Sequence, residues 1–246
     1  MKRKKERINL QAGGFTLIEL LIAMLLGAIV MAAVYATYLT QQKSYFAQNQ
    51  VVEMQQNIRA AMLMLSRDVR EAGCDPTQMS GAGFVTATAG QLRFTRDIAG
   101  HAVNPNQEDG DVLDPNEDIV FGFDPTVDAN GDGIPDGTAA VNFCRRDVNG
   151  ATPAVFQPIA ENIERVEFRY IDENGAFIAS PITSQVNLNS IRAVQVAMLA
   201  RASQQDPKFS NGATYTAPSG TVWGPFNDGF RRRLSVTTIQ SRNKGF

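Results

Sequence analysis

The hydrophobic pattern divides the chain into an apolar stretch, an amphipathic stretch and a long series of short apolar segments. Residues 15–39 carry a single charge, that of Glu19. As a helix they would span roughly 37 Å, which is enough to cross a hydrocarbon layer about 30 Å thick. Beyond residue 40, apolar residues recur at every third or fourth position, and polar residues fill most positions between. This stripe consists of Val51, Met54, Ile58, Met62, Leu65, Val69 and Ala72. Because no proline occurs between 15 and 75, the pattern predicts one continuous helix whose second half has a single apolar face.

The remaining chain predicts short strands that are separated by long polar loops. Gly73 and Pro76 predict the end of the helix. The pair Asn174-Gly175 predicts a hairpin turn with positive φ at both positions. Segments rich in Val, Ile, Phe and Thr predict strands at 91–96, 118–123, 141–145, 165–171, 192–201 and 234–239. A helix followed by antiparallel strands is an α+β pattern, in which the sheet would lie on the amphipathic half of the helix.

Charge is distributed unevenly along the chain. Residues 2–7 carry a net charge of +4 within a chain of net charge −2, which leaves the remainder at −6. The positive-inside rule places residues 1–14 in the cytoplasm and the bulk of the chain outside it. An acidic remainder argues against a nucleic-acid partner. With one histidine, His101, and two cysteines, the chain cannot form a Cys/His zinc cluster, and we expect no enzyme activity.

The apolar stretch differs from a secretory signal peptide and from a plain membrane anchor. A signal peptide has an apolar core of about 7–15 residues that precedes its cleavage site. Here the turn-forming pair Gly13-Gly14 stands before a longer core, so a cut there would leave the whole helix on the product. An anchor does not explain Glu19, since a carboxylate costs roughly 2.5–3.5 kcal/mol at the bilayer centre. A cut after Gly14 would create an amine at Phe15, one helical turn away, and the amine of one subunit could meet the carboxylate of its neighbour.

These residues carry a resemblance. The segment Gly14-Phe15-Thr16-Leu17-Ile18-Glu19-Leu20 resembles the processing motif of type IV prepilins and type II secretion pseudopilins. The resemblance implies that a prepilin peptidase cuts between Gly14 and Phe15 and methylates the new amine, and that Glu19 acts in subunit docking and in methylation. Four further segments, 55–61, 67–73, 164–170 and 232–238, are similar to minor pilins of the PilW type, which are related to the J-type minor pseudopilin of type II secretion.

The family implies a type IV pilin-like fold, in which a long N-terminal helix packs on an antiparallel sheet. Residues 1–14 would be the cytoplasmic leader, 15–39 the transmembrane and filament-core half of the helix, 40–73 its amphipathic half, and 74–246 an extracytoplasmic head. The implied function is that of a minor pilin that helps to initiate and assemble a type IV pilus near its tip. Its partners would be other pilins and minor pilins, the prepilin peptidase and, before assembly, the bacterial inner membrane. A type II secretion minor pseudopilin and a calcium-dependent pilus-tip adhesin remain open as alternatives.

The head contains a candidate calcium loop. Between residues 98 and 144 there are ten acidic residues and no Lys or Arg. Within this stretch, the spacing of oxygen ligands in segment 128–136 matches the front of an EF-hand loop and resembles the loops of dockerin and thrombospondin repeats. The candidate ligands are the side chains of Asp128, Asn130, Asp132 and Asp136 and the carbonyl of Ile134. Position 12 is Ala139 rather than glutamate, so another oxygen, such as that of Asp124, would complete the shell. We expect Ca²⁺ here, with a solvated acidic turn as the alternative.

The two cysteines and a run of three arginines are further features of the head. Cys74 and Cys144 form an even cysteine pair outside the cytoplasm, which favours a disulfide between the helix end and a strand, with two buried free thiols as the alternative. The run Arg231-Arg232-Arg233 is expected to be the solvated start of a strand rather than a site for DNA or an acidic partner.

Overall fold

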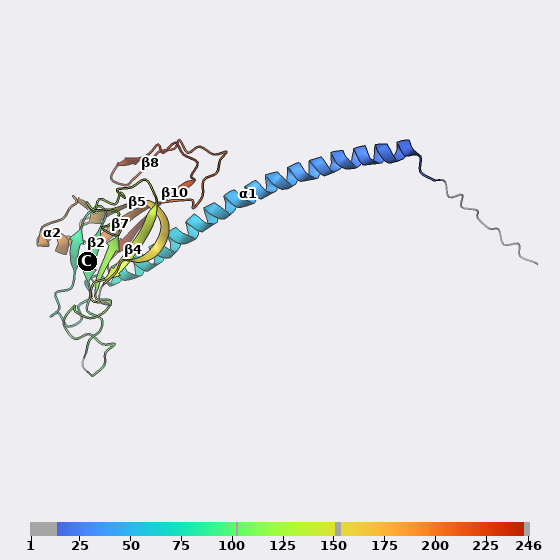
Figure 1. Ribbon diagram of the computed structural model, residues 1–246. Coiled ribbons are helices and arrows are strands. Elements are labelled where there is room, and N and C mark those ends of the chain that lie inside the picture. Colours follow the sequence, from blue (N-terminus) through green and yellow to red (C-terminus); the bar gives the residue numbers. More distant parts are fainter. Residues whose placement is uncertain (1–13, 102, 151–153, 244–246) are drawn as a thin grey trace, which may run out of the picture. The chain divides into compact units, whose positions relative to one another are not determined.

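The computed structural model describes residues 14–101, 103–150 and 154–243 (Figure 1). The chain forms two compact units, of which the first ends at Gln48 and the second begins at Asn49. Helix α1 (Leu17–Glu71) belongs to both units. Except for Gly14, the predicted leader lies outside the described residues. The predicted helix is confirmed at both ends. After its last residue, Gly73 adopts φ +72° and donates its N–H to the carbonyl oxygen of Thr95 at 2.9 Å.

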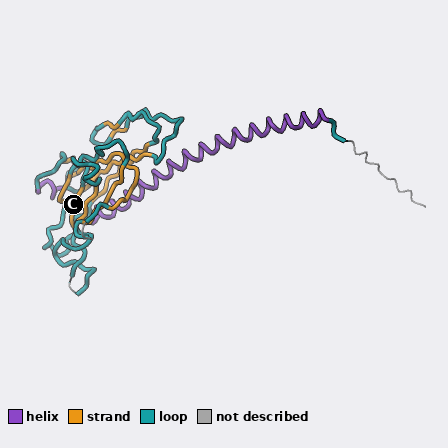
Figure 2. The backbone as a smooth tube through the Cα atoms, viewed as in Figure 1, coloured by secondary structure: helices purple, strands orange, loops and turns teal. Residues whose placement is uncertain are grey.

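The second unit contains an eight-stranded antiparallel sheet (Figures 1 and 2). Seven strands follow one another in space: β1 (Phe84–Ala87), β2 (Leu92–Thr95), β3 (Asp118–Gly122), β4 (Val141–Asp147), β5 (Gln157–Ile171), β7 (Ala193–Arg201) and β10 (Arg232–Gln240). The eighth strand, β6 (Phe177–Ile178), pairs with β5. Outside this sheet lie α2 (Gln185–Ser190) and a hairpin of β8 (Tyr215–Thr216) and β9 (Val222–Trp223). The predicted α+β class is confirmed, with a long N-terminal helix whose second half packs on an antiparallel sheet.

All six predicted strands are present, but one of them is much longer than predicted. Strand β5 begins at Gln157, and its first half pairs with β4 while its second half pairs with β7. The predicted hairpin turn joins β5 to β6, yet positive φ occurs only at Gly175 (+78°). The carboxylate of Asp172 accepts the N–H groups of Asn174 at 2.9 Å and Ala176 at 2.8 Å. This side chain therefore closes a longer turn than the expected two-residue one.

The predicted apolar stripe of α1 forms one side of the main core. All its members from Met54 to Ala72 are buried, and Val51 is half-buried. On the sheet side, phenylalanine rings from β1 to β5 form a row, and the centroids of neighbouring rings lie 6.3 Å apart. This row consists of Phe84, Phe94, Phe121, Phe143 and Phe168. Each such pair adds about 0.5–1.5 kcal/mol beyond the area that it buries.

A second, smaller core lies on the other face of the sheet. Ala197 and Leu199 of β7 pack there with Ala217 and Trp223, which belong to the segment between β7 and β10. Because β7 is covered on both faces, its residues need not alternate between apolar and polar, and seven of the nine from Ala193 to Arg201 are buried.

A buried carboxylate ties the end of α1 to the sheet. Asp68 is fully buried, and its Oδ2 lies 2.8 Å from Nε of Arg145 in β4. Its Oδ1 lies 3.1 Å from Nη2 of Arg67 and 3.6 Å from Nη1 of Arg96. Arg96 also binds Glu71. Asp68 therefore compensates the charge of the half-buried Arg145 and shares that of the buried Arg96 with Glu71.

We expect Asp68→Asn to destabilise the folded second unit by about 3–5 kcal/mol, because it removes the carboxylate that Arg145 contacts and leaves the buried Arg96 with Glu71 alone. Urea unfolding of the full chain in detergent, followed through the fluorescence of its single tryptophan, Trp223, measures this change. Glu161→Gln is the control, since Glu161 is exposed and its change should stay within about 0.5 kcal/mol. Equal stability of the two variants would contradict the assigned role of Asp68.

Candidate functional site

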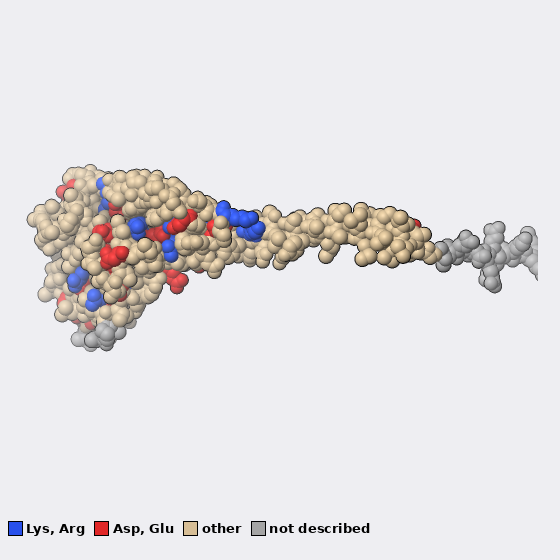
Figure 3. Space-filling model, turned by 45° about the horizontal axis from the view of Figure 1, so that its top comes forward, with Lys and Arg blue, Asp and Glu red and all other residues tan. Residues whose placement is uncertain are grey.

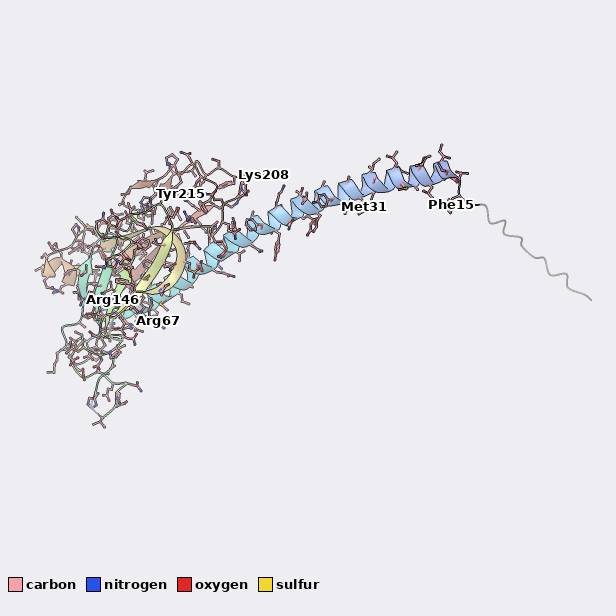
Figure 4. All side chains as sticks on the ribbon, in the orientation of Figure 1. Phe15, Met31, Arg67, Arg146, Lys208 and Tyr215 are labelled. Carbon is pink, nitrogen blue, oxygen red and sulfur yellow. The ribbon has the colours of Figure 1, made fainter. Side chains whose placement is uncertain are left out.

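The predicted cleavage point lies on an accessible segment. Gly14 and Phe15 precede α1, and the side chain of Phe15 is 91% exposed (Figure 4). No atom lies within 4 Å of the position that a Cβ on Gly14 would occupy. The peptide bond between them is therefore sterically open to a protease that reads the start of the helix.

Glu19 has a partner within its own chain that the sequence analysis missed. Its Oε2 accepts the backbone N–H of Thr16 at 2.9 Å and the hydroxyl of Thr16 at 2.8 Å. The N–H of Glu19 in turn donates to Oγ1 of Thr16 at 3.3 Å. This is a capping box, and its sequence signal is a Thr that is followed three residues later by Glu. These hydrogen bonds lower the free-energy cost of placing the Glu19 carboxylate in an apolar helix as long as no amine lies beside it.

The first part of α1 exposes an apolar surface on all sides. Every Leu, Ile, Met and Val between Leu17 and Val34 is more than half exposed. Figure 3 shows almost no charged atoms along this part of the helix, and the sequence has none between Leu20 and Gln42. By length and composition this helix can cross a membrane, since an 18-residue window has a mean hydropathy of 2.7. So large an apolar surface requires lipid or other apolar helices as its surroundings.

The candidate calcium loop is folded around its first ligand. Asp128 is buried, and its two carboxylate oxygens accept the N–H groups of Asp132 at 3.3 Å and Gly133 at 3.0 Å. Oδ1 of Asp132 accepts the N–H of Ile134 at 2.8 Å, and its Oδ2 accepts the side-chain amide of Asn130 at 2.9 Å. Burial raises the pKa of the Asp128 carboxyl, and the charge of Asp132 acts in the same direction. The structure thus brings the front of the loop together.

The remaining predicted ligands of the loop have other partners. Oδ2 of Asp136 accepts the N–H of Ala129 at 2.9 Å. Asp124 was expected to complete the shell, but its Oδ1 accepts hydrogen bonds from the N–H and the hydroxyl of Thr126. Whether a cation recruits these oxygens is not tested by the structure, so the calcium site stays a prediction.

Two glycines allow this loop to lie directly on the sheet. A Cβ on Gly90 would approach the nitrogen of Gly133 to 2.0 Å, and a Cβ on Gly133 would approach the carbonyl oxygen of Val166 to 2.1 Å. The N–H of Val166 in β5 donates to the oxygen of Gly133 at 2.9 Å, and the N–H of Gly90 donates to the oxygen of Gly131 at 3.2 Å. The conformation of the loop is therefore coupled to β5 and to the turn between β1 and β2.

A second acidic group was not recognised in the sequence. Carboxylate oxygens of Asp109, Asp111 and Asp114 lie within 4.8 Å of one another. Burial raises the pKa of the Asp114 carboxyl, and the negative charges of Asp109 and Asp111 raise it further. Gly100, with φ +98°, makes room for the group, because a Cβ there would lie 2.0 Å from Oδ2 of Asp114. The only sequence signal was the density of Asp in this loop.

The predicted disulfide is wrong, since Cys74 and Cys144 are both free. The carbonyl of Cys74 accepts the N–H of Asp97, which follows β2 by two residues. The last residue of β2, Thr95, lies opposite Asp118, so Cys74 is near the first residue of β3. Cys144 lies opposite Gly122, at the other end of β3. Four residues of strand separate these ends by roughly 13 Å, whereas the Cα atoms of a disulfide lie within about 7 Å.

The arginine run at the start of β10 is largely paired rather than solvated. Arg232 is buried, binds Glu164 of β5, and also contacts Asp228 with its Nη1 at 2.6 Å. Arg231 contacts Asp206 at 2.9 Å, and of the three only Arg233 is exposed. The expectation of a solvated run is therefore wrong for Arg232.

The comparisons with known proteins agree with the residues at the N-terminus. Residues 10–35 match the family described as "Prokaryotic N-terminal methylation motif", and residues 126–243 match "Type IV Pilus-assembly protein W". The chain has no significant match among curated proteins. Among solved structures, a type IV-like pilin from Thermus thermophilus has 13% identity and a TM-score of 0.47, covering 78% of this chain and 96% of its own. The two family matches confirm the predicted resemblance.

We expect a thiol reagent to titrate two cysteines per unfolded chain, because both are free. In the folded chain at pH 8, Cys144 should react at least roughly tenfold more slowly than Cys74. Burial raises the pKa of both thiols, but Cys144 is buried and its pKa reaches about 11, whereas Cys74 is only half-buried. Mass spectrometry of the labelled peptides separates the two residues. Cys144→Ala is the control, and its unfolded chain should react with one equivalent of reagent instead of two. If the unreduced wild-type chain has no titratable thiol, the two cysteines form a disulfide after all.

Proposed function

We propose that this chain, a type IV minor pilin of the PilW type, is cut between Gly14 and Phe15 by a prepilin peptidase and then helps to initiate and assemble a type IV pilus near its tip. The observation that carries this proposal is the largely exposed apolar start of α1 with its single carboxylate, Glu19. An apolar helix that must be covered and a charge that needs a partner are together suited to packing among similar helices.

The proposed assembly step replaces one partner of Glu19 by another. Before cleavage, the Thr16 capping box supplies hydrogen bonds to the carboxylate but no positive charge. Cleavage creates an amine at Phe15, and methylation leaves this amine basic. In a bundle of parallel, staggered helices, the amine of one subunit can lie beside the carboxylate of the next. Each charge then offsets the desolvation of the other, which favours incorporation over an isolated helix in lipid.

The same pattern supports a location and a set of partners. The basic residues before α1 favour a single-pass precursor in the inner membrane, with the second unit outside the cytoplasm. Other pilins and minor pilins would cover the apolar helix after extraction from the membrane. The match to a pilus-assembly family favours a type IV pilus over the type II secretion system.

We also propose that loop 128–136 binds Ca²⁺. The buried carboxylate of Asp128 lacks a positively charged partner among the described residues, and its raised pKa reflects the cost of that charge. A cation would lower this cost and the repulsion from Asp132. Because the loop is bonded to β5 through Gly133 and Val166, binding would stabilise the sheet as well as the loop.

We expect Glu19→Gln to be cut normally but to be recovered in sheared filaments at a small fraction of the normal amount. Glutamine can keep the capping box while it removes the charge, so the variant isolates the effect of the charge. N-terminal mass spectrometry should find a methylated Phe15 in the wild-type chain, and immunoblots of sheared fibres measure incorporation.

Thr16→Ala is the matched control, because it removes the cap and keeps the carboxylate. Incorporation of this control should exceed that of Glu19→Gln. A mature chain that starts at Met1 would refute the processing, and normal incorporation of Glu19→Gln would remove the charge pairing.

We expect Ca²⁺ to raise the melting temperature of the chain by roughly 5–10 °C at about 100 times its Kd. Asp132→Ala should abolish most of this shift, since it removes a proposed ligand. Asp111→Ala is the control for the separate acidic group, and it should respond to Ca²⁺ like the wild type. Differential scanning fluorimetry with and without chelator measures all three proteins. If Asp132→Ala keeps the full shift, the cation binds elsewhere.

A further inference from the structure

We propose that the free edge of β10, together with the groove beside it, binds an acidic, extended segment of another protein, which adds to the sheet as a strand. This inference concerns the second unit alone. It goes beyond the packing of apolar helices, and it holds whichever filament the chain joins.

Strand β10 is the last strand in the order of the sheet, so only one of its two edges pairs with another strand. Beside β1, the N–H of Ile182 donates to the oxygen of Ala87 at 2.9 Å. Beside the second half of β5, the oxygens of Ala89 and Gly133 accept backbone N–H groups. Strand β10 pairs with β7 along all nine of its residues, and its backbone has no other partner among the described parts of the chain. An uncovered edge of this length is a template for another strand.

The direction of its free hydrogen-bonding groups follows from its pairing. In an antiparallel strand, successive residues direct their N–H and C=O groups to opposite sides. The oxygen of Arg231 and the N–H of Ser241 both bond toward β7, so the odd-numbered residues between them face β7. The groups of the even-numbered residues therefore point to the free edge: Arg232, Leu234, Val236, Thr238 and Gln240. Only an extended chain matches this two-residue repeat.

A groove of about 960 Å³ lies between α1 and β10. Ile58, Met62 and Leu63 line it from the helix, and the small side chains of Ser235 and Thr237 line it from the strand. Leu63 is 75% exposed, although it belongs to the part of α1 that packs in the second unit. Side chains on one face of an added strand would fill this groove.

The charge of the groove selects an acidic occupant. Arg59, Arg70 and Arg242 line it, and none has an acidic partner among the residues that the structure describes. Arg67, which is labelled in Figure 4, is also in the lining and shares the buried Asp68 with two other arginines. The only acidic residue in the lining is Glu71, and Arg96 already neutralises it. A segment with carboxylates would supply the missing counter-charges.

The test uses a fluorescent peptide of alternating Val and Glu, roughly as long as β10, and the full chain in a non-ionic detergent. Binding is measured by fluorescence anisotropy. Val236→Pro removes an outward-facing N–H and should weaken binding at least about tenfold, while an edge strand tolerates proline there. Val236→Ala keeps the N–H and should bind like the wild type. Melting temperatures of both variants confirm that the sheet is intact.

The charge is tested separately. Arg59→Glu with Arg70→Glu should weaken binding at least about tenfold, whereas Lys208→Glu, an exposed charge outside the groove, should not. No binding of the peptide by the wild type would overturn the proposal. Equal binding by folded Val236→Pro, or equal binding of a proline-containing peptide or a single-stranded oligonucleotide, would also overturn it in favour of a non-specific basic surface. Self-association that Val236→Pro abolishes would make a second copy the occupant instead.

Discussion

Burial of one stripe of α1 against the sheet is the constraint on which the second unit depends. The sheet has an apolar face formed by the phenylalanine row, and the stripe residues from Ile58 to Ala72 cover it. From Leu17 to Val34, in the first unit, the same helix exposes apolar side chains on all sides, with no stripe. One continuous element therefore carries two kinds of surface, because its two parts meet different solvents: water and a sheet for one, lipid or other helices for the other.

Two buried ionic clusters add specificity to this packing. Asp68 connects α1 to β4 through Arg145, and Glu164 of β5 binds Arg232 of β10 and Arg201 of β7. Hydrophobic contacts alone allow one element to shift slightly along another. A buried carboxylate that binds two guanidinium groups allows only one relative position, because a shift would break the ion pairs. Both clusters join segments that are distant in the sequence, so they fix register where local preferences have no influence.

Much of this structure could be predicted from local pattern. The helix stripe, the stop at Gly73 and six strands each depend on a few neighbouring residues. The misses depend on distant ones. The first half of β5 follows from its pairing with β4, β1 has only four residues, and the distance between Cys74 and Cys144 is set by the length of β3. At the site, Gly14, Phe15 and Glu19 were visible as a motif. The Thr16 cap was equally local but was overlooked, and the group around Asp114 required the folded loop.

The order of events during synthesis follows from where the chain closes on itself. The hydroxyl of Ser241 donates to the oxygen of Ala72 at 2.8 Å, across 169 residues of sequence. At about 5–20 residues per second, the ribosome takes roughly 10–30 s to make the intervening chain. During that interval the apolar stripe of α1 has emerged while its last partner strand does not yet exist. Until the final residues are made, the chain is therefore an intermediate with a partly uncovered apolar surface, and it is exposed to aggregation.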